Sequence, residues 1–475
     1  MSFSRINVLL AALVCTIAAW FGVGFQSEDE FYQVISVAQH LRGLASAEDQ
    51  LMDFHAHWRS MLMPVIAAGV LEAGERLGLT DPFALAFILR LLTAALAIIV
   101  LRDLARVAKQ SLRPENHQAL DALNWFLWFV PILLMRFTGE AWSALLFARG
   151  LTLLLDEKPR SAWAIGAWWG AVVIIRPAVA VLPLSAWVWA LLVKKEERAR
   201  LTLIVGGGVI AIVACTALDS LCYGTFTTPL WNYFAAALSG QENARFMTLP
   251  WHQHGLFILK YATIPVGVLL LAALVVLLAL NRKHVLVWVL LPFLIAHSVV
   301  PVKEPRFLFP LAALMPWLLV AAWDALCQRW PVPKQRTLWL RLLFPFAAVN
   351  LLALLVAMLT PAGNGRIRLA EAMRARFGDE PVHIDLLGDW RQNIPAFYLS
   401  PESTESFVDR VVPDAGKPIH LVIAAESEGL DRVSNLQQIT TGAPRWSHRY
   451  LRWYGLEDGY DPLVLYRLET GVIDH

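Results

Sequence analysis

Long apolar runs recur along the first 360 residues of this chain, and they constrain the fold more than any other feature. The first of them, NVLLAALVCTIAAWFGV, begins at residue 7. A run of about 20 apolar residues has the length that crosses the hydrocarbon core of a bilayer as a helix. Only 16% of the residues are charged, whereas a soluble domain carries about 25%. The sequence therefore predicts an α-helical polytopic membrane protein.

We predict about eleven transmembrane spans from these runs. The run at 61–73 is not counted, because it is short, contains Pro64 and leads into LEAGERLG. Such a segment is typical of an amphipathic helix lying in the membrane interface. The predicted spans are 7–25, 82–101, 121–137, 141–155, 161–175, 178–193, 201–221, 256–280, 285–301, 306–326 and 340–360.

The distribution of Lys and Arg assigns the two sides of the membrane. With the N-terminus in the cytoplasm, the basic segments 102–113, 194–200 and 328–341 all fall on the cytoplasmic side, as the positive-inside rule requires. A twelfth span at 61–73 would move the basic loop 102–113 to the opposite face. The charge pattern therefore favours eleven spans.

The residues after 360 differ from the rest of the chain. They contain short β-like runs, VHIDLL, IHLVIAA and PLVLYRL, with helical or loop segments between them. This pattern predicts a small α/β domain. We expect two domains: a transmembrane domain at 1–360, whose first outer loop at 26–81 forms interfacial helices, and an extramembrane domain at 361–475 on the outer side.

Charged and polar side chains gather on the predicted outer face. Each alone has an ordinary interpretation, as a solvated loop acid, an arginine that reaches the headgroups, or a loop histidine. Lys303 and Arg306 are harder to dismiss, because positive charge usually avoids this side. The candidates are Glu28, Asp29, Glu30, Asp53, His55, His57 and Arg59 in the first loop, then Arg176, Asp219, Tyr223, Asn232, His252, His254, Lys303, Glu304 and Arg306.

These residue types indicate one class of reaction. A carboxylate can remove the proton of an acceptor hydroxyl, and cations can stabilise a departing phosphate. Both kinds of group at one membrane face favour transfer of a group from a lipid-phosphate carrier to a hydroxyl. The His-x-His pairs at 55–57 and 252–254 are weak evidence for a metal, and the four cysteines lack metal-ligand spacing. We therefore predict neither a metal nor a cofactor.

The same residues carry a resemblance to a known family. The chain resembles the GT-C class mannosyltransferases of the GPI-anchor and N-glycan pathways, which use dolichyl-phosphate-mannose. The family's first loop opens HPDE-x-x-Q, and SEDEFYQ at 27–33 keeps the Asp, the second Glu and the Gln. The other matching elements, in family order, are Met52-Asp53-Phe54 with Arg59-Ser60, Ile175-Arg176-Pro177, Asp219-Ser220 with Tyr223-Gly224, Thr228-Pro229 with Asn232-Tyr233, Trp251-His252, and Lys303-Glu304 with Arg306-Phe307 and Pro310.

The resemblance implies roles for these residues. An inverting transfer needs one general base, for which Asp29 is the candidate, with Glu30 and Asp53 as supporting acids. Arg176, Lys303 and Arg306 are expected to contact the donor phosphate. The residues expected to bind the substrates are Arg59, Asp219, Tyr223, Asn232, His252 and Glu304.

The function expected from these residues is transfer of a hexose, mannose by the resemblance, from a polyprenyl-phosphate-sugar to a glycan or lipid-linked acceptor. The partners are then membrane lipids, the lipid-linked donor and a glycan or glycolipid acceptor, and not nucleic acid. The expected location is a bacterial inner membrane with a periplasmic active site, or the ER membrane with a lumenal site in a eukaryote.

Two alternative functions stay open. One is a GT-C enzyme that uses another lipid-phosphate sugar, of the arabinose or aminoarabinose type, or an oligosaccharide ligase. The other is a lipid or solute transporter.

Overall fold

The computed structural model describes residues 3–48, 50–158, 160–239, 248–330, 336–363, 365–388, 393–409, 419–430, 435–454 and 462–468. The chain divides into two compact units. One, here called the helical unit, consists of Met1–Ala19, Glu28–Ala73 and Ile88–Leu355. The other, the sheet unit, consists of Trp20–Ser27, Gly74–Phe87 and Val356–His475. The predicted domain boundary at residue 360 stays a prediction.

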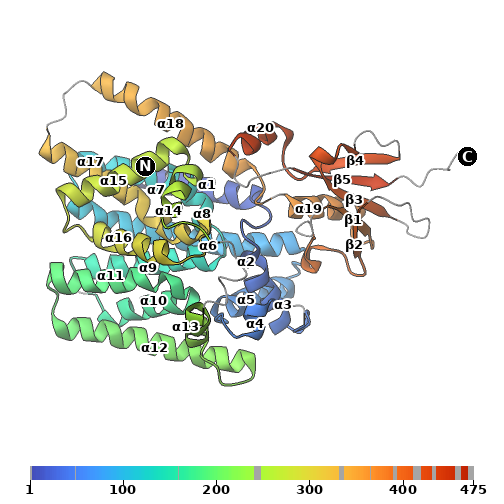
Figure 1. Ribbon diagram of the computed structural model, residues 1–475, viewed down its shortest axis with the longest axis horizontal. Helices are drawn as coiled ribbons and strands as arrows, with labels where there is room; N and C mark the ends of the chain where they lie inside the picture. The colour runs from blue at the N-terminus through green and yellow to red at the C-terminus, as the bar shows by residue number, and fades with distance from the viewer. Residues whose placement is uncertain are drawn as a thin grey trace, which may run out of the picture. The chain divides into compact units, whose positions relative to one another are not determined.

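Helices account for nearly all regular structure before residue 360 (Figure 1). Short helices of the first loop are α2 Glu28–Glu30, the π-helix Phe31–Ile35, α3 Ser36–Leu41 and α4 Met52–His55. The longer ones are α1 Phe3–Phe21, α5 Leu62–Arg76, α6 Pro82–Ala108, α7 His117–Phe126, α8 Phe129–Leu134, α9 Gly139–Leu155, α10 Ala162–Ile175, α11 Val181–Trp189, α12 Arg198–Tyr223, α13 Pro229–Ser239, α14 Gln253–Tyr261, α15 Ile264–Leu280, α16 Val285–Val299, α17 Met315–Arg329 and α18 Arg336–Leu359.

Several of these helices have the length and composition of membrane spans. Within the described residues, four helical stretches are long and apolar enough to cross a bilayer: Pro82–Ser111, Pro177–Lys194, Arg198–Tyr223 and Pro305–Arg329. Five shorter apolar helices accompany them, at Ile6–Phe21, Ala162–Ile175, Ile264–Leu280, Val285–Val299 and Phe344–Leu359. The predicted helical fold is confirmed, whereas the number of eleven spans and the interfacial position of α5 stay predictions.

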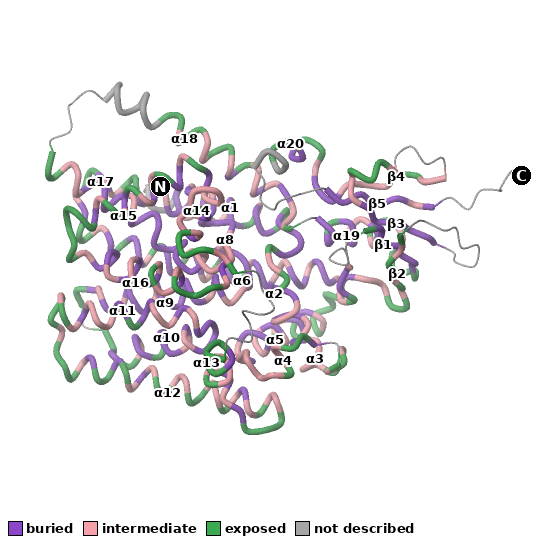
Figure 2. The backbone as a smooth tube through the Cα atoms, viewed as in Figure 1, coloured by how far each residue is buried: buried purple, intermediate pink, exposed green. Residues whose placement is uncertain are grey.

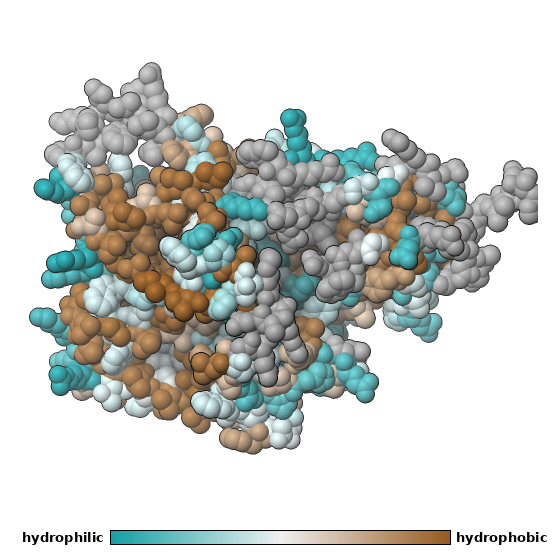
Figure 3. Space-filling view, in the orientation of Figure 1, coloured by the Kyte–Doolittle hydropathy of each residue, from teal (hydrophilic) through white to brown (hydrophobic). Residues whose placement is uncertain are grey.

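Burial differs sharply between apolar helices of the helical unit (Figure 2). Only 17% of the apolar window of α12 is buried, against 72% for Pro305–Arg329. An apolar helix this exposed would be a liability in water, so its outer surface is suited to lipid. In Figure 3 brown, apolar side chains cover much of the visible face of the helical unit.

Glycines let α10 and α12 approach closely along their length. A Cβ atom added to Gly166 of α10 would lie 1.9 Å from the Ile204 carbonyl oxygen. One added to Gly207 of α12 would lie 2.3 Å from the Trp163 carbonyl oxygen. Small residues at helix crossings are a standard way of bringing backbones together in membranes. Here they fix the position of α10, whose C-terminal end carries Arg176.

We predict that Gly166→Ala destabilises the protein by about 1–3 kcal/mol, because the methyl group forces the two helices apart. Gly208→Ala is the matched control, since its Cβ atom would lie 3.5 Å from the nearest neighbour, the Gly166 carbonyl oxygen. Thermal unfolding in detergent measures both variants. Equal melting temperatures for Gly166→Ala and Gly208→Ala would contradict this packing.

The sheet unit contains five strands in the order β2-β1-β3-β5-β4. They are β1 His383–Leu387, β2 Thr404–Val408, β3 His420–Ala425, β4 Leu436–Thr441 and β5 Leu463–Leu468. β1 is parallel to both β2 and β3, whereas β5 is antiparallel to β3 and β4. The helices α19 (Arg366–Phe377) and α20 (Arg445–Tyr454) complete the unit. The predicted small C-terminal α/β fold is therefore present.

Candidate active site

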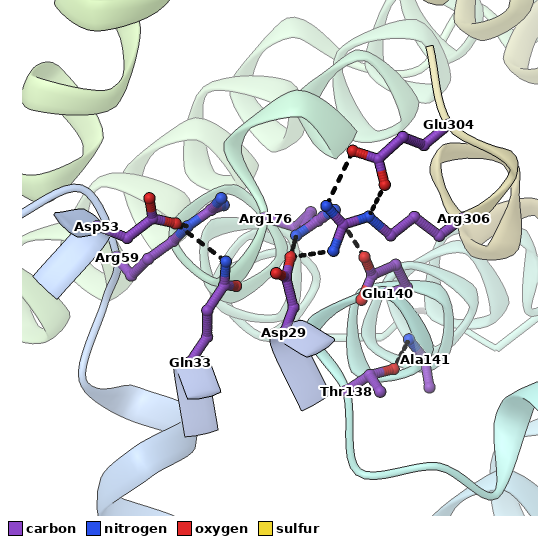
Figure 4. A network of polar contacts seen from close by, with 10 residues as sticks. All are labelled: Asp29, Gln33, Asp53, Arg59, Thr138, Glu140, Ala141, Arg176, Glu304 and Arg306. Carbon is purple, nitrogen blue, oxygen red and sulfur yellow. Dashed lines mark hydrogen bonds and ion pairs between the residues drawn. The ribbon is translucent and has the colours of Figure 1, made fainter. Parts of the chain in front are cut away.

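The first loop brings the acids of SEDEF to the arginines of distant segments. Asp29 lies in α2, which runs directly into the π-helix and α3. Gln33 follows one turn later, so both side chains project from the same side of the segment (Figure 4). A π-helical turn is rare and often marks a functional site.

Asp29 lies in a group of five charged side chains, here called the Asp29 cluster: Asp29, Glu140, Arg176, Glu304 and Arg306. The Asp29 Oδ2 atom accepts a short hydrogen bond from Arg306 Nη1 and lies 3.9 Å from Arg176 Nη1. Arg176 Nη2 also lies 2.6 Å from Glu140 Oε1. Arg306 Nη2 donates to Glu304 Oε1 at 3.0 Å. Each guanidinium is therefore shared between two carboxylates (Figure 4).

A second polar group adjoins this cluster. Asp53 Oδ2 accepts hydrogen bonds from Gln33 Nε2 at 3.0 Å and from Arg59 Nε at 2.9 Å. Burial lowers the pKa of Arg59, but the carboxylates of Asp53 and Asp29 outweigh it, so the pKa is raised and the side chain stays cationic. Arg59 also lies over the ring of Tyr233, with its guanidinium carbon 5.6 Å from the ring centroid.

Glu30 points away from the Asp29 cluster. Its two carboxylate oxygens accept from Arg136 Nε at 2.9 and 2.7 Å. The pair is almost fully buried, with side-chain exposures of 7% for Glu30 and 2% for Arg136, whereas Asp29 and Arg306 are each 18% exposed. These contacts show Glu30 fixing α2 to the segment after α8, and they leave Asp29 as the more accessible acid.

Asp219, Tyr223 and Asn232 all bind the backbone or side chains of the first loop. Asp219 Oδ1 accepts from Ser60 Oγ at 2.8 Å and from the Met61 amide at 2.7 Å, just before α5 begins. The Tyr223 hydroxyl donates to the Arg59 carbonyl oxygen at 2.9 Å. Asn232 Nδ2 donates to the His57 carbonyl oxygen at 3.2 Å. The structure thus brings these three residues to the loop, and their predicted contact with substrate stays a prediction.

Lys303 and His252 lie apart from the acids. The Lys303 ammonium donates to the carbonyl oxygens of Leu249 at 3.0 Å and Val300 at 2.5 Å. Lys303 is buried, which lowers its pKa. These contacts join the turn that carries Glu304 and Arg306 to the segment before α14. His252 is exposed beside Trp251 at the start of α14. The expected contact of Lys303 with the donor phosphate stays a prediction, and so does the expected contact of His252 with a substrate.

Three residues of this region were not among the predicted site residues. Glu140 follows FTG at the start of α9, where Thr138 caps the helix by accepting from the Ala141 amide. In the sequence, Glu140 could have been noticed as a carboxylate at the start of an otherwise apolar run. Arg136 was a charge within a predicted span, and such charges usually have a partner. Gln33 was visible only as part of the resemblance.

His254 was a candidate of the outer face to which no role was assigned. It is 1% exposed, and neither ring nitrogen has a hydrogen-bond partner among the described residues. Burial, with smaller effects of His297 and Lys303, lowers its pKa to about 4, so the ring is neutral at physiological pH.

The arrangement of the Asp29 cluster has a chemical consequence. Both described contacts of Asp29 are made by Oδ2, so Oδ1 is left to accept a proton from a bound hydroxyl (Figure 4). Two guanidiniums stand beside it, and guanidinium forks match the geometry of phosphate oxygens. A carboxylate with the chemistry of a general base and two guanidiniums with the geometry to hold a phosphate therefore lie side by side.

Comparison with solved structures places the fold. The chain resembles ArnT from Cupriavidus metallidurans bound to undecaprenyl phosphate, with a TM-score of 0.57, 12% sequence identity and 97% of each chain covered. The apo structure of the same protein gives a TM-score of 0.53 over the same shares. At 12% identity this likeness shows the fold alone, which is the fold of a membrane-embedded protein of the ArnT kind.

The sequence comparisons give the family. Residues 6–383 match the Alg9-like mannosyltransferase family. The chain belongs to this family, which confirms the predicted resemblance and makes the protein an enzyme rather than a transporter. It is also 28% identical over 343 residues to GPI mannosyltransferase 3 of Yarrowia lipolytica, covering 69% of this chain. The match spans 62% of the length of that relative.

The buried Glu30–Arg136 ion pair allows a prediction about the free energy of unfolding of variants. Glu30→Gln leaves a buried guanidinium without its charge partner, which costs about 3–5 kcal/mol. The double variant Glu30→Gln/Arg136→Met removes both charges, so we expect it to be more stable than Glu30→Gln alone. Thermal unfolding of the wild type, both single variants and the double variant measures the coupling. Additive effects of the two substitutions would show that the pair is not coupled.

Proposed function

We propose that this enzyme transfers a hexose, mannose in the first instance, from a polyprenyl-phosphate-sugar donor to a hydroxyl of a glycan or lipid-linked acceptor. The single observation that carries the proposal is the Asp29 cluster, where the described contacts of the Asp29 carboxylate with two guanidiniums are all made by one oxygen, Oδ2. We place this cluster at the outer membrane face, which is periplasmic in a bacterium and lumenal in the ER.

The proposed reaction is a single displacement. The acceptor oxygen attacks the anomeric carbon of the donor from the side opposite the phosphate. The hydroxyl proton passes to Asp29 Oδ1, the bond between the anomeric carbon and the phosphate oxygen breaks, and polyprenyl phosphate leaves. One displacement inverts the anomeric centre, so a β-linked donor gives an α-linked product. General base catalysis of this kind contributes about 10²–10⁴-fold to the rate.

Arg176 and Arg306 are the proposed phosphate ligands. In the structure their forks are held by Glu140 and Glu304 as well as by Asp29. Carboxylate partners orient the guanidiniums before the donor binds, and preorganised cations are the kind that stabilise a leaving phosphate effectively. When a phosphate replaces Asp29 Oδ2 on the forks, the carboxylate is released toward the acceptor.

Two findings support a lipid-phosphate donor. The ArnT structure of similar fold was determined with undecaprenyl phosphate bound. The exposed apolar surface of α12 is suited to the polyprenyl chain or to membrane lipid. Mannose as the donated sugar is supported by membership of the Alg9-like mannosyltransferase family and by the likeness to GPI mannosyltransferase 3.

The Asp53 group is proposed to support the base. Arg59 and Gln33 hold the Asp53 carboxylate on the side of Asp29 opposite to Arg306 (Figure 4). Tyr223, Asn232 and His252 are proposed to line the sugar or acceptor site. Because Asp219, Tyr223 and Asn232 fix the loop backbone, part of their effect on transfer is expected to come through the position of Arg59.

A second candidate donor is the one that the sequence left open, a lipid-phosphate sugar of the arabinose or aminoarabinose type. The fold likeness to ArnT covers 97% of this chain and is compatible with either donor. Incubating the purified enzyme with each radiolabelled donor distinguishes them, because only the true donor is consumed with formation of the matching glycoside.

We predict that Asp29→Asn lowers transfer from polyprenyl-phosphate-mannose at least ~100-fold, because an amide cannot accept the hydroxyl proton. The protein should still insert and migrate as the wild type in size-exclusion chromatography. The matched control is Glu28→Gln, which removes the exposed carboxylate of the preceding residue and should keep turnover within a few-fold. Near-normal transfer by Asp29→Asn would show that another group is the base.

A further inference from the structure

The sheet unit holds a cluster of metal-ligand side chains that the proposed transfer does not use. His383 and Asp385 stand two residues apart on β1, so both side chains lie on the same face of the sheet. β3 is the parallel neighbour of β1, and His420 is the register partner of His383. The three side chains therefore converge from two adjacent strands, at the end where both strands begin.

Both imidazoles point their Nε2 atoms at the one carboxylate. His383 Nε2 lies 3.0 Å from Asp385 Oδ1, and His420 Nε2 lies 2.8 Å from Asp385 Oδ2. The ligand atoms of the three residues all lie within 4.8 Å of one another. Ligands about 2.0–2.1 Å from a tetrahedral Zn²⁺ ion stand roughly 3.3 Å apart. Small rotations of the side chains are therefore enough to bring all three onto one ion.

Burial and charge favour a cation at this place. His383, Asp385 and His420 are 7%, 4% and 3% exposed. Among the described residues, the only ion-pair partners of Asp385 are these two histidines. A histidine carries no permanent positive charge, so the described partners give this buried carboxylate no fixed counter-charge, and a buried charge without one is costly. A divalent cation bound by the same three side chains supplies the missing charge.

The surroundings also fit a metal centre. His383 Nδ1 lies 2.7 Å from Thr404 Oγ1 on β2, and ligand histidines commonly hold their second nitrogen by such an outer hydrogen bond. His420 Nδ1 is buried and has no hydrogen-bond partner among the described residues. The hydrogen bonds among the described residues therefore do not satisfy every polar atom of the three side chains. On the same face of the sheet follow apolar residues, Leu387 and Val422, which shield the site.

We propose that His383, Asp385 and His420 bind one divalent transition-metal ion, for which Zn²⁺ is the ion best matched to two imidazoles and a carboxylate. The ion joins β1 to β3, whose ligands are separated by 35 residues in the chain. Because a metal links these segments only when they are folded, its binding stabilises the sheet unit. This site is independent of the proposed transfer reaction.

The first test is the metal content of the full-length protein, purified in detergent with a tag that contains no histidine. After incubation with Zn²⁺ and removal of loosely bound ion, mass spectrometry of the metals should find about one Zn²⁺ per chain. Asp385→Asn and His420→Gln should each lose most of it. His448→Gln is the matched control, because His448 is also buried in the sheet unit but its Nε2 lies 2.9 Å from the Ala443 carbonyl oxygen. It should keep the ion.

A second test needs no variant. X-ray absorption of the zinc-loaded wild-type protein should show two imidazole nitrogens and a carboxylate oxygen at about 2.0–2.2 Å. Chelation should lower the melting temperature, and added Zn²⁺ should restore it. Failure of the wild type to retain zinc would overturn the proposal. So would retention of zinc by Asp385→Asn and His420→Gln, since the ion would then be bound elsewhere, for example by the His-x-His pairs.

Discussion

The shared ion pairs of Asp29 are the contacts on which the site depends. One oxygen of this carboxylate lies between the guanidiniums of Arg176 and Arg306, which come from the end of α10 and from the 3-10 helix Pro305–Leu314. The first loop, α10 and that 3-10 helix are distant in sequence. The ion pairs of Asp29 join these three segments, and each arginine also has a second carboxylate partner.

Other buried polar contacts hold the segments that carry the Asp29 cluster in position. Glu30 and Arg136 fix the helix that carries Asp29, and Asp219 fixes the start of α5. Lys303 fixes the turn before Arg306 through two backbone carbonyls. Buried charges of this kind add little net stability, but removing one partner is costly. Their role is to position the first loop, which leaves the charges of the Asp29 cluster, among them the partly exposed Asp29 and Arg306, for chemistry.

The sequence was sufficient for the fold class, the enzyme class and the family, because apolar run length and ordered motifs are local features. It could not assign contacts between distant segments. Arg136 and Glu30 are 106 residues apart, so their pairing was invisible, and Glu30 looked like a partner of Asp29. Lys303 looked like a phosphate ligand from the resemblance and from its predicted side of the membrane, whereas the structure shows its ammonium bound to backbone carbonyls.

The sheet unit illustrates the same limit. The runs VHIDLL and IHLVIAA predicted strands, but none of their residues was a candidate for a site. The meeting of His383 and Asp385 with His420 depends on the strand order and on the register of β1 with β3, and neither can be read from a single sequence. The expectation of no metal was therefore reached without the one fact that bears on it.

We propose that the Asp29 cluster performs one inverting displacement on a polyprenyl-phosphate-sugar. The most direct test is to determine the stereochemistry and stoichiometry of the product that the purified enzyme makes from β-linked polyprenyl-phosphate-mannose. We expect an α-linked mannoside and one polyprenyl phosphate released for each mannose transferred. A β-linked product, or transfer that requires a nucleotide sugar in place of the lipid-linked donor, would contradict it.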